Sequence, residues 1–357
     1  MPVTINEVAK EAGVSITTVS RVLNNNYPVK KETRERIEQA IEKLNYRPNI
    51  MARGLITKRT SVIGIIVPGI TNLFFSTIVE EIQSIIKKSG YSISLCNTGG
   101  SYKEERNLVE DMLCRQADGI IVIDPAIENI KEHYYKQIGE KLPTIIINSA
   151  SDNNDCSCIC YDEESGLEQA FEYLNNLKHN KVLLIRGEKS LSYDIREEIY
   201  KKFIDKYGFD YEKVLTVGGG NSIEVVEKTE KELMRIFQED KPTAVFACND
   251  LMAVGATKVC KRLSLRIPED ISIISVDNTL LAQTNSPRLT SIDFNMSNIA
   301  KVVSMDILDK INKDSRQITK KVFKTELIQG ESCKEAKDTK IDLKEGTTLK
   351  FKKVVLK

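Results

Sequence analysis

Apolar residues in the first 46 positions recur every three or four residues, which is the spacing of amphipathic helices. Three helices are predicted: one that starts at Thr4, one over residues 16–23 and one over residues 31–44. Thr4 can cap the first helix with its side chain, and Glu7, at the third helical position, can accept a hydrogen bond from the Thr4 backbone N–H, as in a capping box. The segment 13–15, Gly-Val-Ser, supplies a tight turn and a new cap. Two short helices joined by such a turn predict a helix-turn-helix.

From Thr60 onwards, short apolar runs alternate with amphipathic helical stretches. Such runs are typical of strands that are buried on both faces, so the alternation predicts parallel sheets covered by helices. Eight runs fit two doubly wound halves better than one, and a (β/α)8 barrel is the main structural alternative. The eight runs cover residues 62–67, 92–96, 119–123, 144–147, 182–185, 213–217, 244–247 and 271–276.

The predicted fold class is therefore α/β: an all-α helix-turn-helix head at residues 1–47 is joined to two doubly wound parallel-sheet subdomains at residues 61–330. The connecting residues 48–60 contain an apolar stretch that is too short to be a stable helix alone in water. Residues 331–357 are expected to form a charged C-terminal extension. Lobe 1 is expected at about 61–160 and 292–320, and lobe 2 at about 161–291 and 321–330.

The charge of the chain is distributed unevenly, although its net value is only +1. Residues 1–60 contain 11 Lys and Arg against 6 Asp and Glu, and the last 24 residues contain 8 Lys against 4 acids. The segment between them is acidic. Only the two ends of the chain are therefore suited to contact a polyanion such as DNA.

The composition predicts a cytoplasmic protein, because the N-terminal segment lacks an apolar signal region and no stretch reaches the length of a membrane helix. Eight scattered cysteines indicate free thiols and not a disulfide framework. Cys156, Cys158 and Cys160 share one face of a predicted strand, but their spacing matches no common zinc pattern, so a structural role is favoured. No cofactor and no metal are predicted.

The second helix presents polar residues outward in the way a recognition helix does. Arg21 can donate two hydrogen bonds to guanine, Thr17 can contact a base, and Ile16 lies in the first turn, where such helices meet base edges. Phosphate contacts are expected from Ser15, Thr18, Ser20 and Asn24.

Several motifs together resemble the LacI/GalR family of transcription regulators. They are residues 4–24, Tyr46-Arg-Pro-Asn49, Ala52-Arg-Gly-Leu55 and the segments 246–255, 267–271 and 287–291, in order along residues 4 to about 330. The resemblance implies two sensor lobes like those of type I periplasmic binding proteins, a homodimer, a near-palindromic operator and a small-molecule effector, a carbohydrate or related metabolite.

The resemblance also implies that Ala52 to Ile56 form a hinge helix in the DNA minor groove, with Leu55 wedged into the central base step. Repression is the expected default output. The predicted DNA contacts are Thr4, Ser15, Ile16, Thr17, Thr18, Ser20, Arg21, Asn24, Asn49, Ala52, Arg53 and Leu55.

Predicted effector contacts follow the strands, because open α/β halves bind ligands at the carboxyl ends of their strands. Through the resemblance, Arg196 is expected to reach into the cleft and Asp277 to accept hydrogen bonds from ligand hydroxyls. The predicted contacts are Phe74, Phe75, Asn148, Arg196, Asn249 and Asp277.

The chain departs from the family pattern at several of these loops. Gly69, Leu73 and Ile199 replace the usual Asp, Pro and Gly, and the loop 217–221 lacks the aromatic residue that relatives often place over the ligand. The pocket is therefore expected to differ from a typical hexose site. A phosphate cradle at Gly218–Gly220 is a weaker alternative, since it matches no known phosphate-binding fingerprint.

Three other functions are weighed against this prediction. A periplasmic sugar-binding protein would carry a secretory signal, and an enzyme would need acid, base and nucleophile sets that a chain with two histidines does not display. A regulator whose corepressor is a phosphocarrier protein in place of a metabolite stays open.

Overall fold

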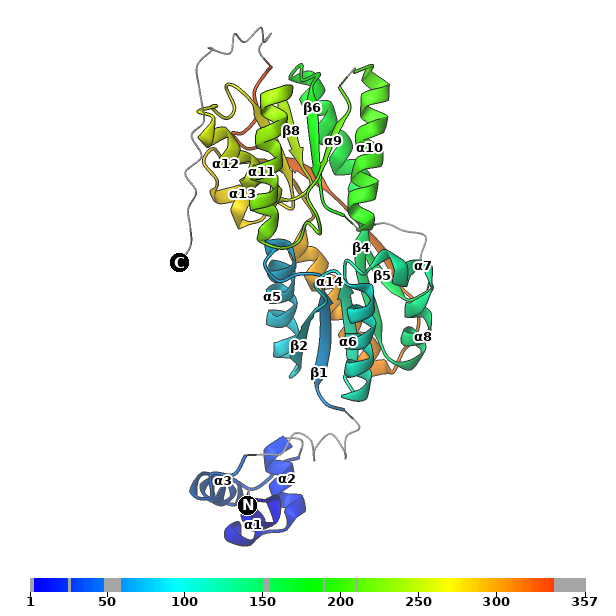
Figure 1. Ribbon diagram of the computed structural model, residues 1–357. Helices are drawn as coiled ribbons and strands as arrows, with labels where there is room; N and C mark the ends of the chain where they lie inside the picture. The colour runs from blue at the N-terminus through cyan, green and yellow to red at the C-terminus, as the bar shows by residue number, and fades with distance from the viewer. Residues whose placement is uncertain are drawn as a thin grey trace, which may run out of the picture. The chain divides into compact units, whose positions relative to one another are not determined.

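The computed structural model describes residues 3–24, 27–47, 59–149, 155–188, 190–209 and 211–336. The chain divides into two units, one of Met1–Val62 with Gln116–Asp118 and one of Ile63–Arg115 with Gly119–Lys357. The first unit contains the head, and the second is the sensor domain; Figure 1 labels the helices of both and several strands of the sensor domain.

The head consists of three helices, α1 (Ile5–Ala12), α2 (Ile16–Asn24) and α3 (Lys31–Lys43), which confirms the predicted helix-turn-helix and third helix. The backbone N–H of Thr4 donates to the Glu7 carboxylate at 2.7 Å, and this hydrogen bond lowers the pKa of Glu7. Gly13 ends α1 in the left-handed conformation (φ 65°), which turns the chain towards α2. Side chains of all three helices, including Val8, Val19 and Ile37, form the core.

Lobe 1 of the sensor domain is built on a six-stranded sheet with the order β11-β5-β4-β3-β1-β2. The pairs β1/β3, β3/β4, β4/β5 and β5/β11 are all parallel. Its strands are β1 (Val62–Val67), β2 (Ser92–Asn97), β3 (Gly119–Ile123), β4 (Thr144–Ser149), β5 (Ser157–Asp162) and β11 (Lys320–Lys324). Its helices are α5 (Leu73–Lys88), α6 (Tyr102–Cys114), α7 (Ile127–Lys131), α8 (Tyr134–Lys141) and α14 (Met296–Lys313).

Lobe 2 is built on a second six-stranded sheet with the order β12-β10-β9-β8-β6-β7. Its pairs are parallel except for the antiparallel pair β10/β12. Its strands are β6 (Val182–Arg186), β7 (Lys213–Thr216), β8 (Ala244–Ala247), β9 (Ser272–Val276), β10 (Thr290–Asp293) and β12 (Glu326–Ile328). Its helices are α9 (Glu163–Asn176), α10 (Leu191–Tyr207), α11 (Glu224–Glu239), α12 (Asp250–Arg262) and α13 (Leu280–Thr284).

Two separate open sheets confirm the doubly wound halves and exclude the barrel. All eight predicted strands are present, and β5, β10, β11 and β12 are additional. The strand β11 pairs with β5 in lobe 1, so residues 321–324 belong to lobe 1 and not to lobe 2 as the sequence suggested. These four strands are short or carry mixed polar residues, which hides them from an apolar-run criterion.

The chain passes between the lobes after β5, after β10 and between β11 and β12. Thr325 ties two of these crossings together. Its Oγ1 donates to the Asp162 carbonyl at 2.6 Å and accepts from the Gly166 backbone N–H at 2.9 Å. The first and third crossings therefore form one hydrogen-bonded hinge.

Residues 331–336, which the sequence placed in the C-terminal extension, pack on lobe 2. The Ile273 N–H donates to the Ser332 carbonyl at 3.0 Å, and the Ala336 N–H donates to the Leu177 carbonyl at 2.8 Å. Ser332 is fully buried. Within the described part of the chain, no helix has both the length and the apolar run needed to cross a membrane.

Candidate functional site

The exposed surface of α2 carries the residues that the sequence assigned to base reading. Ile16 is 48% exposed, and Thr17 and Arg21 are also exposed. Ser15 begins the helix: its Oγ accepts from the Thr18 N–H at 3.2 Å and lies 2.9 Å from Thr18 Oγ1. The Thr18 hydroxyl is thus engaged within the helix cap, while Ile16, Thr17 and Arg21 face outward.

Arg21 is held from the side by an aromatic ring. Its guanidinium lies 5.1 Å from the centroid of Tyr27, a cation–π contact that limits the rotamers of an otherwise exposed side chain. Thr4 is exposed at the start of α1, and Ser20 is half-buried in α2. The predicted contacts Asn49, Ala52, Arg53 and Leu55, and the side chain of Asn24, lie outside the described residues.

A second site lies between the two lobes, where strands of both sheets end. A deep pocket with a volume of about 20 Å³ is found there. It is lined by Asn72, Phe74, Phe75, Asp124, Tyr161, Ser190, Ser192, Tyr193, Arg196, Asn221, Asn249, Asp277 and Phe294. Five of the six predicted effector contacts are thus gathered in one place. Asn148, the sixth, lies buried in β4 and does not line this pocket.

The aromatic wall of the deep pocket begins at α5. Asn72 caps this helix, because its Oδ1 accepts from the Phe74 N–H at 3.0 Å, and the cap fixes the first turn that carries both phenylalanines. The Phe74 ring packs edge-on against Phe294, with 5.6 Å between centroids, and against Tyr161 at 6.2 Å. Both Phe74 and Phe75 are buried, so each belongs to the core as well as to the pocket wall.

Arg196 reaches the pocket but is paired within the protein. Its Nε donates to Glu163 Oε2 at 2.5 Å, its Nη2 donates to Oε1 at 3.0 Å, and its Nη1 donates to the Cys248 carbonyl. The exposed fractions of the two side chains are 6% for Arg196 and 2% for Glu163. A bidentate pair of this kind neutralises the guanidinium, so Arg196 does not present a free charge to a ligand.

Asn249 caps α12 and also faces the pocket. Its Oδ1 accepts from the Met252 N–H at 2.9 Å, and its Nδ2 donates to the Gly220 carbonyl at 2.8 Å and to Tyr193 Oη at 3.2 Å. The Tyr193 hydroxyl in turn donates to Asn221 Oδ1 at 3.2 Å. Asn249 therefore holds the loop 217–221 and Tyr193 in place.

Asp277 follows β9 and is buried, and its Oδ2 has no hydrogen-bond partner in the protein. Burial, together with the nearby Asp250 carboxylate, raises the pKa of Asp277 well above its ordinary value. A buried carboxyl oxygen without a partner is costly, so Asp277 is suited to accept a hydrogen bond from a ligand or to hold a proton.

Direct bonds join the lobes around the pocket. Asn72 Nδ2 donates to Asn221 Oδ1 at 3.2 Å, and the Ser190 hydroxyl lies 3.3 Å from each oxygen of Asp124. Burial raises the pKa of Asp124 to about 7, and the positive charge of Arg196 opposes this shift. The cleft in this structure is closed by contacts between its own walls.

Sequence analysis missed Asp124, Glu163 and Tyr193. Asp124 directly follows β3, so the strand-end rule that selected Asn249 and Asp277 also points to it. Glu163 directly follows β5, a strand that the sequence analysis did not predict, and Tyr193 lies inside α10, where no strand end marks it.

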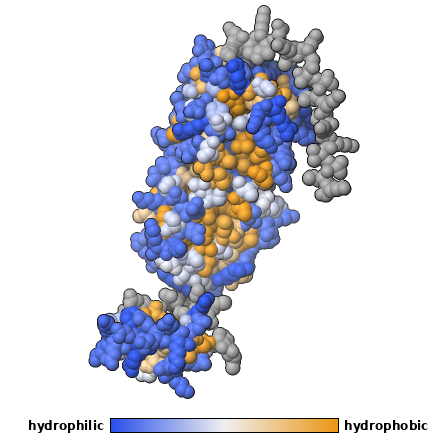
Figure 2. Space-filling model, turned by 90° about the vertical axis from the view of Figure 1, so that its left-hand side faces the viewer, coloured by the Kyte–Doolittle hydropathy of each residue, from blue (hydrophilic) through white to orange (hydrophobic). Residues whose placement is uncertain are grey.

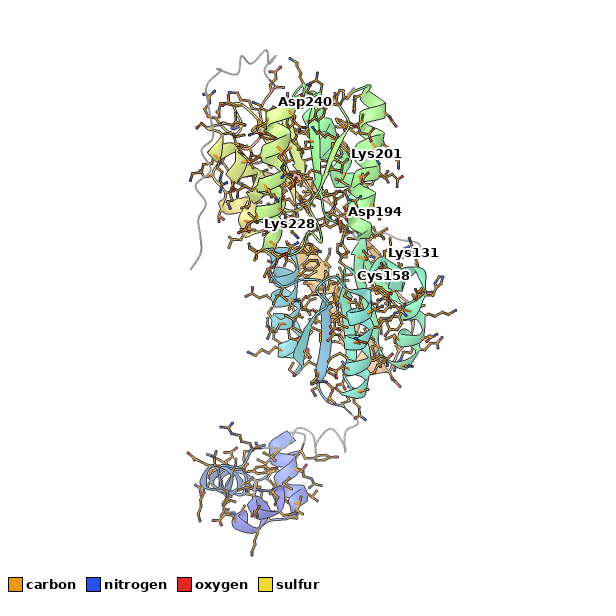
Figure 3. All side chains as sticks on the ribbon, in the orientation of Figure 1. Lys131, Cys158, Asp194, Lys201, Lys228 and Asp240 are labelled. Carbon is orange, nitrogen blue, oxygen red and sulfur yellow. The ribbon has the colours of Figure 1, made fainter. Side chains whose placement is uncertain are left out.

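The cysteines of β5 are buried, and Cys158 can be located in Figure 3 within lobe 1. Cys156, which the sequence placed on the same strand, lies just before β5. Burial raises its pKa to about 12, so its thiol is protonated at neutral pH. No cluster of three or more His, Cys, Asp or Glu side chains suited to a metal ion occurs among residues that the structure describes.

Two family models match the chain. Residues 4–49 match the bacterial regulatory proteins of the lacI family, and residues 171–333 match a periplasmic binding protein-like domain. The first match covers the head and the second lies in the sensor domain.

Relatives match over nearly the whole chain. Catabolite control protein A of Priestia megaterium is 33% identical over 322 residues, covering 88% of this chain and 94% of the relative. The HTH-type transcriptional repressor PurR of Vibrio vulnificus is 33% identical over 323 residues, covering 90% and 95%. In structure, a Lac repressor dimer bound to operator and the anti-inducer ONPF matches with a TM-score of 0.81, 24% identity and coverage of 94% and 100%.

The chain therefore belongs to the lacI family of bacterial regulatory proteins. It is a DNA-binding transcriptional regulator with a ligand-binding domain of the periplasmic binding protein type, and not an enzyme.

Proposed function

We propose that this chain is a cytoplasmic homodimeric repressor whose affinity for a near-palindromic operator is controlled by a small molecule bound between its lobes. The observation that carries the proposal is one chain that joins a head with an exposed recognition helix to a two-lobed cleft lined by side chains of both lobes. The head reads the operator, and the state of the cleft sets how well it does so.

In the DNA-binding part of the proposal, α2 enters the major groove. Arg21 reads a base, with Tyr27 limiting its motion, and Ile16 and Thr17 lie against neighbouring base edges. Ser15, Thr18, Ser20, Asn24 and Thr4 contact phosphates or support the helix. Asn49, Ala52, Arg53 and Leu55 act in a hinge helix in the minor groove.

The homodimer uses an apolar face of the sensor domain that spans both lobes. Figure 2 displays apolar residues over the side of this domain that carries α5 and β2 in lobe 1 and α13 in lobe 2. Leu95 in β2 is 45% exposed and Leu280 in α13 is 64% exposed. Since β2 is an edge strand of its sheet, an exposed leucine there favours a protein partner.

The effector binds in the interlobe cleft, near Phe74, Phe75, Arg196, Asn249 and Asp277. A related regulator of Enterococcus faecium, 25% identical with a TM-score of 0.65 and coverage of 77% of this chain and 100% of that chain, was solved with bound ribose. This supports a carbohydrate-like effector. A ligand that prefers the closed lobes shifts the population towards them and so changes operator affinity.

The test is selection of bound sequences from randomised duplex DNA by the purified protein and by Arg21→Ala. The wild type should select a near-palindrome, and Arg21→Ala should lose one base preference at a cost of about 1–3 kcal/mol. The operator is then titrated with added metabolites. No consensus from the wild type would contradict operator reading, and a response only to an added protein would replace the metabolite by a protein corepressor.

A further inference from the structure

The deep pocket between the lobes is nearly filled in this structure. Its volume of about 20 Å³ has room for about one water molecule. Asp277, which lines it, has one carboxyl oxygen, Oδ2, with no hydrogen-bond partner among the residues that the structure describes. The pocket thus offers a polar group that a ligand hydroxyl can satisfy, but it has no space for a ligand while the lobes are closed.

The side chain of Tyr193, in α10, forms part of the wall of this pocket and is buried. Two glycines make room for it: a Cβ on Gly187 would lie 2.4 Å from Tyr193 Cε2, and a Cβ on Gly220 would lie 2.4 Å from Tyr193 Oη. The ring therefore lies in a slot that a side chain at either glycine would close. The loop 217–221 contains no aromatic residue of its own, so the helix supplies the ring on this side of the pocket.

Polar contacts hold the Tyr193 ring in one position within its slot. The hydroxyl donates to Asn221 Oδ1 and accepts from Asn249 Nδ2, each at 3.2 Å. The guanidinium of Arg196 lies 5.8 Å from the ring centroid, which is a cation–π distance. Movement of the ring out of the slot would break all three contacts, so we treat the ring as a fixed wall of the pocket.

All the groups that hold this ring belong to lobe 2. The glycines, asparagines and arginine that contact it lie in or beside β6, β7, α10 and α12, which are elements of that lobe. The bonds Asn72–Asn221 and Ser190–Asp124 instead join lobe 1 to lobe 2. Separation of the lobes to admit a ligand breaks the bonds between lobes and leaves those within lobe 2. An effector therefore meets the Tyr193 ring in the open cleft as well as in the closed one.

We propose that Tyr193 sets the upper limit on the size of the effector: a polyhydroxylated molecule with the size of a pentose ring binds against the phenol face, and the additional hydroxymethyl group of a hexose collides with it. This inference rests on the proposed function, because it assumes a carbohydrate-like effector in the cleft. The C–H face of such a ligand packs on the aromatic ring, and one of its hydroxyls bonds to the unpartnered oxygen of Asp277.

The test is calorimetric titration of the full chain with four pairs of aldoses. Each pair consists of a pentose and the hexose that carries one more hydroxymethyl group on the same ring: ribose and allose, xylose and glucose, L-arabinose and galactose, lyxose and mannose. In a pair that binds, the Kd of the wild type should be at least about tenfold lower for the pentose. Tyr193→Ala should abolish this preference, because removal of the ring leaves space for the hydroxymethyl group.

Control variants separate the ring from its hydroxyl and from the rest of the helix. Tyr193→Phe keeps the ring and should keep the preference for pentoses. Tyr207→Ala removes the same kind of side chain from α10, but Tyr207 is half-buried and lines a separate groove, so this variant should also keep the preference. Cooperative thermal unfolding, followed by circular dichroism, shows that each variant folds. If alanine at residue 193 prevents folding, Tyr193→Leu removes the ring and retains an apolar side chain.

The inference and the proposed function fail in different ways. A hexose that binds the wild type as tightly as its pentose, with no change in Tyr193→Ala, would overturn the size limit and leave small-molecule control intact. An equal loss of preference in Tyr207→Ala would also overturn it, because the ring at residue 193 would not be its cause. If none of the sugars binds the wild type or a variant, the size limit fails; if no other metabolite changes operator affinity either, the proposed small-molecule control fails as well.

Discussion

At the scale of single residues, the buried pair Arg196–Glu163 is a structural element of the cleft. Glu163→Gln should lower the free energy of unfolding by about 3–5 kcal/mol, because it leaves the Arg196 charge buried without its partner. Urea denaturation measures the loss. The matched control is Glu172→Gln, which breaks the exposed pair with Lys206 and should cost less than about 1 kcal/mol. Equal, small losses for both variants would show that Arg196 is free to serve a ligand.

Asp124 predicts a pH dependence of stability. Its pKa is raised from 3.8 to about 7, so the folded protein holds a proton that the unfolded chain releases. The stabilisation is complete below about pH 4 and is lost as the pH rises towards 7. Asp124→Asn cannot ionise, so it should match the wild type near pH 4 and be more stable at pH 8.

The expected gain at pH 8 is about 1–2 kcal/mol. The full shift, at about 1.4 kcal/mol per pKa unit, would give more, but Asp124 is only half-buried and water screens part of the penalty. Urea unfolding of both proteins from pH 4 to 8 measures the difference. Parallel curves across this range would mean that folding does not raise the pKa of Asp124.

Some residues of the cleft could be predicted from the sequence, and others could not. Asn249 and Asp277 were found because a strand end places a polar residue at the cleft by geometry alone. Asn148, which the same rule selected, is buried in β4 and is not among the described residues that line this pocket. Glu163 also stands at a strand end, but its strand, β5, was not predicted, and the position of Tyr193 depends on how α10 packs, which no local pattern encodes.

At the scale of elements, the first turn of α9 packs closely against the interlobe crossing at Thr325. A Cβ on Gly166 would lie 2.5 Å from Thr325 Oγ1 and 2.7 Å from Ile292 Cγ2. Gly166→Ala should therefore lower the free energy of unfolding by about 1–3 kcal/mol, although alanine favours helices. The matched control is Gly139→Ala in α8, where the nearest atom is Cys156 Cβ at 3.3 Å and the change should be close to neutral.

Thermal unfolding of the two glycine variants separates the steric effect of a Cβ at residue 166 from the general effect of alanine on helix stability. Equal stabilisation of both would mean that the crossing strands move aside, and that Thr325 does not constrain α9. A loss confined to Gly166→Ala would locate the strain at the contacts of the added Cβ with Thr325 Oγ1 and Ile292 Cγ2.

Strands that are apolar throughout were predictable from the sequence, and several short strands or strands with mixed polar residues were not. The strands β3, β6 and β9 are apolar throughout and were found by that property. The strand β11, Lys-Lys-Val-Phe-Lys, lies at a sheet edge, where its three lysines discourage further pairing, so its composition resembles that of a loop. Its pairing with β5 is set by the long-range path of the chain and not by local residues.

At the scale of the whole molecule, the apolar face of the sensor domain predicts that dimerisation and operator affinity are lost together. Leu280→Lys and Leu95→Lys each place a charge on this face, where Leu280 is 64% and Leu95 is 45% exposed. Sedimentation velocity should show a shift from dimer to monomer for both. Val322→Lys is the matched control, since Val322 is 53% exposed on β11, the opposite edge of the same sheet from β2.

The consequence for DNA binding follows from the linkage of two heads. A dimer on a two-half-site operator gains a high effective concentration for the second head, worth about 10²–10⁴ in affinity over a single half-site. Leu280→Lys should reduce the affinity for the full operator to nearly that for one half-site, while its affinity for the half-site stays unchanged because the head is untouched. Equal losses on both DNAs would indicate damage to the head, and no loss on the full operator would place the dimer interface elsewhere on the sensor domain.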